Sequence, residues 1–148
     1  MPTSSRFVVA VHILTALAVG DGVPMRSEDL AHSANTGAVV IRSLLSRLAQ
    51  AGLTSAQMGA GGGAMLAMPA ATIRLLDVYR AVEDTELFTL HRLAPLATCS
   101  VGGNIQQALR PTLDKARNAM EAELADVTIA QVAADVARLG KFTIPLQW

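Results

Sequence analysis

The sequence of 148 residues has little cysteine, few aromatic residues and no excess of charge. Its single cysteine, Cys99, excludes a disulfide within the chain and any metal site made only of cysteines from one chain. A lone thiol is typical of a reducing compartment, so we expect a cytoplasmic protein. Apolar residues make up 51% of the chain but aromatic residues only 3%, so a core of alanine, leucine and valine is expected, which favours helices.

A formal net charge of zero argues against nonspecific binding to polyanions. Residues 1–82 hold six Lys or Arg and four Asp or Glu, a difference of +2, whereas residues 83–148 hold six and eight, a difference of −2. This mild asymmetry makes the first half of the chain the better candidate for contacting phosphates.

The apolar run Phe7–Val19 is too short to span a bilayer, and it contains His12 and Thr15. We therefore expect a buried first helix and no membrane partner; an export segment is the alternative.

Apolar spacing predicts a mainly helical chain with one hairpin. Ser27, Thr72 and Thr128 are the expected N-caps of three of the helices. Pro111 should break or kink the longest helix, because it lacks an N–H group and clashes with the preceding turn. The expected helices cover residues 4–19, 27–33, 38–51, 73–82, 103–125 and 128–138, and the expected strands cover residues 53–58 and 64–68.

The order helix, turn, helix, hairpin between residues 27 and 68 is that of a helix-turn-helix followed by a β-wing. The second helix, 38–51, would present its N-terminal end to the major groove, with Arg42 as the best candidate for a guanine or phosphate contact. A solvated helix face is the alternative for Arg42 and Arg47, and Arg47 could simply complement the helix dipole. The full set of expected DNA-binding residues is Arg26, Ser27, Thr36, Gly37, Val39, Val40, Arg42, Ser43, Arg47, Gly59 and Gly61.

The glycine-rich tip at residues 59–63 lacks the lysine of a phosphate-binding loop, and Pro69 follows before a helix could begin. Nucleotide binding is therefore not expected. Glycines at a hairpin tip permit positive φ angles and a close approach to a phosphate. The alternative is a plain surface hairpin.

An apolar stripe runs along the helix at 103–125 and predicts either a dimer interface, which we favour, or packing against the same chain. The expected interface residues are Ile105, Leu109, Leu113, Met120 and Leu124.

Cys99 and His91 could suggest a nucleophile and base, but nothing in the sequence orients the histidine, so we expect no enzyme. A sensor thiol at Cys99 and a small half-buried residue are the two remaining interpretations. His12 and His32 have no partners at metal-ligand spacing, so no metal or cofactor is expected.

Four segments together resemble the Rrf2 family of winged helix-turn-helix transcriptional regulators. These are Asn35–Ala67, Ile73–Glu83, Cys99–Gln106 and Thr128–Ala130. The resemblance implies a DNA-binding head at residues 1–83, and a sensor loop with dimerisation helices at residues 84–148. It also implies a homodimeric repressor with helix 38–51 in the major groove.

The chain departs from this pattern in two places. Cluster-bearing relatives use three cysteines where this chain has one, so we expect no iron–sulfur cluster. Many relatives carry arginine before the wing glycines, where this chain has Gln57-Met58. We expect weaker or more sequence-selective DNA binding as a result.

The sequence thus predicts a homodimeric repressor of a pseudo-palindromic operator, responding to redox stress at Cys99 or to a small effector. The alternative is a winged-helix protein-interaction module that does not bind DNA.

Overall fold

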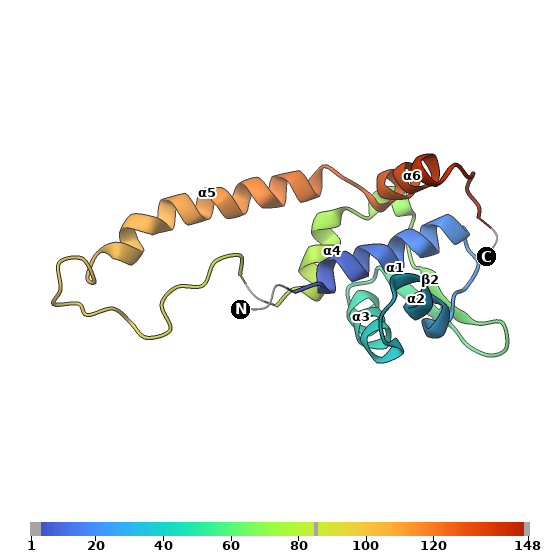
Figure 1. The fold of residues 1–148 in the computed structure, drawn as a ribbon, viewed down its shortest axis with the longest axis horizontal. Coiled ribbons are helices and arrows are strands. Elements are labelled where there is room, and N and C mark those ends of the chain that lie inside the picture. Colours follow the sequence, from blue (N-terminus) through green and yellow to red (C-terminus); the bar gives the residue numbers. More distant parts are fainter. Residues whose placement is uncertain (1–3, 85, 147–148) are drawn as a thin grey trace.

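The computed structural model describes residues 4–84 and 86–146, which form six α-helices, one short 3-10 helix and a two-stranded antiparallel sheet (Figure 1). The expected mainly helical winged fold is confirmed. The elements are α1 Arg6–Gly20, α2 Ser27–Ala34, α3 Ala38–Gln50, β1 Thr54–Gln57, β2 Gly63–Leu66, the 3-10 helix Ala70–Thr72, α4 Leu75–Val82, α5 Ile105–Ala125 and α6 Ile129–Gly140.

Helix α1 is the centre of the core. It contacts α2, α3, α4, α6 and β2, and in Figure 1 it runs between α6 above and α2 and α3 below. Ile13 and Leu14 have no exposed surface, and Leu17 has almost none. The apolar run at residues 7–19 is therefore a core helix. No helix in the described ranges is long and apolar enough to cross a membrane.

The turn between α2 and α3 is set by Asn35, which adopts a left-handed conformation with φ of 49°. Asparagine tolerates this region better than most residues. The N–H of Thr36 donates to the carbonyl of Ala31 at 3.0 Å and closes the end of α2. Gly37 then caps α3 with an extended backbone. The sequence-based boundaries of both helices are correct to within one residue.

Two of the predicted N-caps are wrong. Arg26, and not Ser27, caps α2, because its backbone is extended and its carbonyl accepts from the N–H of Leu30 at 3.1 Å. Ser27 therefore lies inside the first turn. Thr72 belongs to the 3-10 helix, where its hydroxyl donates to the carbonyl of Pro69 at 2.7 Å. Helix α4 begins two residues later than predicted, after Arg74.

The wing consists of β1, β2 and the tip between them, with Thr54 paired to Leu66 and Gln57 to Gly63. Met25 adds a third short pairing, because its N–H and carbonyl both bond the backbone of Ala64. A side chain at Gly63 would lie 2.4 Å from the carbonyl oxygen of Met25, so this close approach requires glycine. This third segment, which joins the base of the wing to the chain before α2, was not predicted from the sequence.

Helix α5 extends away from the other helices and contacts α4 near its C-terminal end (Figure 1). Of the predicted break or kink at Pro111, the break is wrong, because the helix is continuous through this residue. The missing N–H leaves one carbonyl, that of Gln107, without its helical partner, and both residues are exposed to water that can replace it.

The predicted cap of α6 is confirmed. The hydroxyl of Thr128 accepts from the N–H of Gln131 at 3.2 Å, and the Gln131 side chain accepts from the N–H of Thr128 at 2.8 Å. The helix runs two residues past the predicted end at 138, and Lys141 terminates it in a left-handed conformation.

The central place of α1 gives a direct stability prediction. Leu14→Ala should destabilise the chain by about 2–5 kcal/mol, because it removes buried methyl groups and leaves a cavity. The same substitution at Leu139, whose side chain is 73% exposed, should change stability by less than about 0.5 kcal/mol. Urea unfolding of both variants at one chain concentration makes the comparison. Equal losses would contradict the assignment of α1 as the core helix.

Candidate DNA-binding surface

Helix α3 divides its residues between the core and the solvent. Ile41, Leu44 and Leu48 are buried against the rest of the fold, whereas Val39 is 76% exposed and Val40 is 44% exposed. Arg42 and Ser43, half a turn further on, are also exposed. The N-terminal end of α3 therefore presents its outward side chains to solvent. Helix α2, helix α3 and the wing all lie on the lower side of the molecule in Figure 1.

The other expected contact residues lie around this end of α3. Thr36 is half-buried in the turn, Gly37 is the exposed cap of α3, and Arg26 is the exposed cap of α2. Ser27 is half-buried in the first turn of α2. The helix-turn-helix thus gathers residues from two helices and the turn between them at one surface.

The wing tip is uncharged and strongly exposed. Met58 is 87% exposed, and Gly59 and Gly61 have φ angles of 89° and 75°. A side chain at Gly62 would lie 2.1 Å from the carbonyl oxygen of Gln57. The glycines therefore build a tight turn whose backbone can approach another molecule closely. No cation lies at the tip to bind a phosphate by charge.

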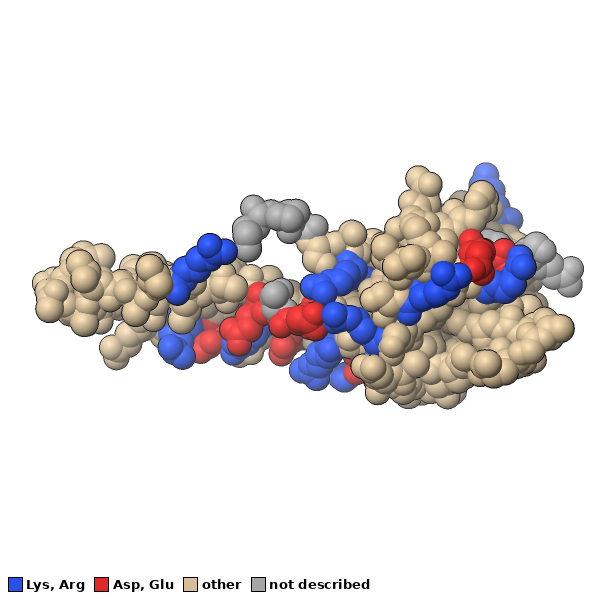
Figure 2. All heavy atoms as spheres, turned by 90° about the horizontal axis from the view of Figure 1, so that it is seen from below, with Lys and Arg blue, Asp and Glu red and all other residues tan. Residues whose placement is uncertain are grey.

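Each expected contact arginine is paired with a carboxylate. Arg42 on α3 donates to Glu28 on α2, and Arg26 donates to Asp29 at 3.1 Å. Figure 2 views this lower face and shows blue basic side chains beside red acidic ones, instead of one continuous basic surface. The basic side chains of this face are therefore offset locally by acidic ones.

Arg47 is held in a different way. Its guanidinium donates to Asp84 at 2.7 Å and to the carbonyl of Val82 at 3.3 Å, both at the end of α4. Asp84 also accepts from Arg6 at 3.1 Å. The hydrogen bond from Arg47, and then its charge, lower the pKa of Asp84 below the ordinary value, so this carboxylate stays ionised to a lower pH. Arg47 thus ties α3 to α4, which agrees with a structural role for this arginine.

The residues of the predicted dimer interface lie along the projecting part of the chain. Leu109 is 42% exposed, and no residue of α5 is fully buried. Ile105, Leu113, Met120 and Leu124 are half-buried. Segment 86–91 runs beside the first half of α5 and adds Phe88 and Leu90, which are also partly exposed. A long apolar surface therefore remains open on the single chain.

Cys99 is exposed in the segment between α4 and α5. The backbone N–H of Gly102, and after it that of Val101, lower the pKa of the Cys99 thiol below its ordinary value of 9.0. These N–H groups favour the thiolate, which is the reactive form. His91 does not assist it, because its contact is with the side chain of Gln106 at 3.3 Å. The arrangement favours the thiolate form of Cys99 and does not pair this thiol with His91.

Known proteins share this sequence and architecture. A family model described as "Rrf2: Iron-dependent Transcriptional regulator" matches residues 3–135. The protein YwnA of Bacillus subtilis (strain 168), described as a candidate helix-turn-helix transcriptional regulator, is 39% identical over 130 residues, or 87% of this chain and 95% of that protein.

Two solved structures extend the comparison. The crystal structure of a candidate DNA-binding protein has a TM-score of 0.70 at 37% identity, and the match covers 86% of this chain and 98% of that one. The crystal structure of a candidate transcriptional regulator from Lactobacillus plantarum has a TM-score of 0.74 at 27% identity and covers 92% of each chain.

The iron named in the family description has no matching ligand set here. The sequence supplies one cysteine, whereas iron–sulfur clusters are held by several thiolates. Within residues 4–84 and 86–146, no three His, Cys, Asp or Glu side chains gather closely enough to hold a metal ion. The residues present therefore do not fit a cluster bound by one chain.

Proposed function

Since this chain belongs to the Rrf2 family of transcriptional regulators, which are not enzymes, we propose that it binds a pseudo-palindromic operator as a cytoplasmic homodimer and represses transcription there. The observation that carries the proposal is the exposed N-terminal end of α3, with Val39, Val40 and Arg42 directed away from a buried anchor of Ile41 and Leu44. This is the part of a recognition helix that contacts base edges in the major groove.

The remaining contact residues fit the same docking. Thr36, Gly37 and Ser43 surround the exposed end of α3, and Arg26 and Ser27 begin the neighbouring helix α2. With α3 in the major groove, the wing tip at Gly59–Gly63 lies against the backbone or the minor groove. Ala60 is the largest residue of the tip at 59–63, so the backbone there can approach a phosphate closely without a charged side chain.

A second copy of the chain is the partner that the stripe on α5 requires. Ile105, Leu109, Leu113, Met120 and Leu124 leave an apolar surface incompletely covered over most of a 21-residue helix. Two copies joined through α5 would present two α3 helices related by a two-fold axis. Such dimers read half-sites about one helical turn apart, or roughly 34–36 Å.

Because the arginines of this surface are paired with carboxylates, we expect DNA binding that is selective for sequence but not tight. Each phosphate contact that a protein makes steepens the dependence of affinity on salt by about one unit of slope. Few unpaired cations lie on this surface, and the wing has Gln57-Met58 where many relatives carry arginine. We therefore expect a shallow salt dependence and a large contribution from base contacts and shape.

A protein-interaction module that does not bind DNA is the second candidate. The paired arginines Arg26 and Arg42 and the uncharged wing favour it, because they leave little positive potential for a polyanion.

Alanine substitutions of Arg42 and Arg47, both on α3, test DNA binding against the interaction module. Arg42→Ala should weaken operator binding by about 1–3 kcal/mol if the guanidinium reads a base. Arg47→Ala is the matched control and should weaken it much less, because Arg47 is occupied by Asp84 and Val82. Fluorescence anisotropy with a duplex from the chain's own promoter region, titrated at several salt concentrations, measures both. If the native chain binds no duplex at low salt, the DNA-binding proposal is overturned and the interaction module remains.

For the signal we propose oxidation at Cys99. Peroxide would convert the thiolate to a sulfenic acid while being reduced to water, and the product can form a disulfide with another thiol. The lowered pKa of Cys99 leaves more thiolate at neutral pH than an ordinary cysteine has. Segment 86–91, on the same connection between α4 and α5, lies beside the α5 stripe, so a change in this connection can reach the dimer interface.

Mild peroxide should alter operator affinity in the native chain and leave Cys99→Ser unchanged. The rate of the response should fall as pH is lowered through the depressed pKa of the thiol, because protonation removes the reactive form. Anisotropy before and after treatment at several pH values provides the data. Identical responses of the two chains would remove Cys99 from the mechanism.

A further inference from the structure

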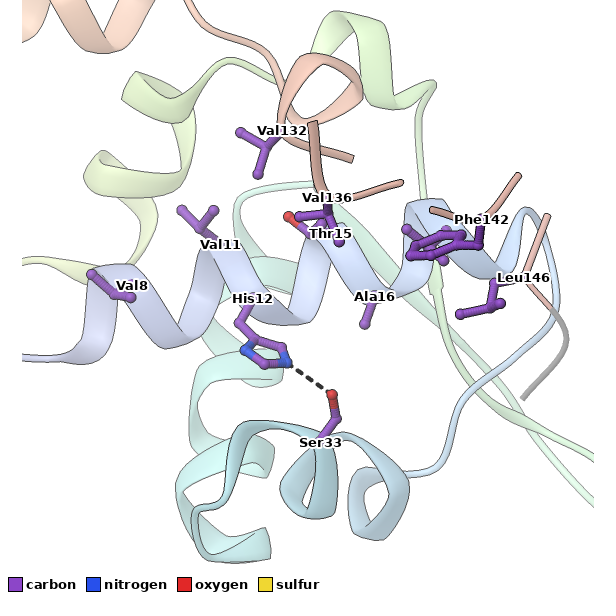
Figure 3. Close-up of a pocket in the computed structure, with 11 residues that line it drawn as sticks. Val8, Val11, His12, Thr15, Ala16, Ser33, Val132, Val136, Phe142 and Leu146 are labelled. Atoms are coloured by element: carbon purple, nitrogen blue, oxygen red, sulfur yellow. Dashed lines mark hydrogen bonds between the residues drawn. The ribbon is translucent and has the colours of Figure 1, made fainter. Parts of the chain in front are cut away.

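A cavity of about 430 Å³ opens between α1, α6 and the chain that follows α6 (Figure 3). Ser33 of α2 lies at one end of it, and valine is the commonest residue of its walls. The lining residues used below are Val11, His12, Thr15, Ser33, Val132 and Val136.

The lining is apolar with polar groups from only a few side chains. Lys, Arg, Asp and Glu are absent from the described lining, so a charged ligand would lose its hydration without gaining a partner. Nε2 of His12 lies 2.9 Å from the hydroxyl of Ser33, and this contact joins α1 to α2 at one end of the cavity.

The hydroxyl of Thr15 is the least expected feature of this wall. Thr15 is only 7% exposed, and within the described chain its Oγ1 has no hydrogen-bond partner. Buried polar groups are nearly always bonded, and Oγ1 of Thr15 has almost no accessible surface of its own, so a small rotation of this side chain toward the cavity would give the hydroxyl a partner on a bound molecule. Figure 3 shows Thr15 on the side of α1 that faces Val132 and Val136 of α6.

We propose that this cavity binds a neutral, mainly apolar small molecule carrying one hydrogen-bonding oxygen or nitrogen, which pairs with the hydroxyl of Thr15. The volume lies in the range of ligand sites, roughly 300–1,000 Å³. A compact bicyclic aromatic alcohol has the required size, apolar surface and single polar group. The site itself is independent of DNA binding; only its regulatory consequence rests on the function proposed above.

The cavity walls come from the helix-turn-helix and from the helix that follows α5, the two parts whose relative placement a regulator would change. Ser33 lies in the last turn of α2, directly before the turn that positions α3. Val132 and Val136 lie on α6, which follows α5 after a short connection. A molecule seated here touches both the helix-turn-helix and the helix joined to α5, so it can favour one placement of these elements over another.

Beta-naphthol is a suitable probe, and equilibrium dialysis against the full-length chain measures its binding. Naphthalene is the matched probe without the hydroxyl, and naphthoate is the matched anion. The native chain should bind beta-naphthol saturably, at one site per chain, more tightly than naphthalene and much more tightly than naphthoate. No saturable binding of beta-naphthol by the native chain would overturn the proposal.

Two tryptophan substitutions on α6 test the location. Val136→Trp should fill the cavity and weaken beta-naphthol binding at least about tenfold, since a misfit of even one carbon group in an apolar site has that effect. Leu139→Trp, one turn away and outside the lining, should bind as the native chain does. Equal binding by both variants would place the ligand elsewhere.

Thr15→Val tests the hydroxyl while nearly preserving the shape of the side chain. This variant should bind beta-naphthol and naphthalene with similar affinity, and a retained preference for beta-naphthol would overturn the role of Thr15. Operator anisotropy with and without beta-naphthol then tests coupling. Saturable naphthol binding by a chain that binds no DNA would support the site and reject the proposed function, so the two claims fail separately.

Discussion

The burial of α1 is the constraint on which the other elements depend. Ile13 and Leu14 have no exposed surface, and α2, α3, α4, α6 and β2 all contact this helix. Burial of this apolar surface is the dominant favourable term in folding, so the elements packed on α1 are positioned by it. The exposed end of α3 is therefore a consequence of how Ile41, Leu44 and Leu48 are placed in the same core.

Arginine–carboxylate pairing sets the electrostatic character of the same surface. Glu28 holds Arg42, and Asp29 holds Arg26, at the end of the helix-turn-helix that would meet DNA. Asp84 holds Arg47 and Arg6, so α3, α4 and the start of α1 are joined where the segment containing Cys99 begins. Exposed pairs of this kind add little to stability, but they lower the potential of the surface and restrict the guanidinium groups. A regulator built this way depends on geometry more than on charge.

Local signals predicted the fold well, whereas partners distant in the sequence could not be predicted. The apolar stripe of α3, the turn at Asn35 and the cap at Thr128 depend only on neighbouring residues, and all three are confirmed. The caps predicted at Ser27 and Thr72 were wrong for local reasons, namely the extended backbone of Arg26 and the 3-10 helix Ala70–Thr72. The pairing of Arg47 with Asp84, the bridge from Met25 to Ala64 and the cavity beside Thr15 join segments far apart in the chain. No spacing rule brings such segments together.

The central claim is that α3 reads DNA from a two-fold dimer joined through α5. Hydroxyl-radical footprinting of the chain's own promoter region tests it most directly. A dimer of this kind should give two protected patches of equal extent, related by a two-fold axis and separated by about one helical turn. Leu113→Glu on the α5 stripe should abolish both patches together, because a charge in an apolar interface separates the two copies. A single protected patch with the native chain, or one patch that persists with Leu113→Glu, would show that the chain does not bind DNA as this dimer.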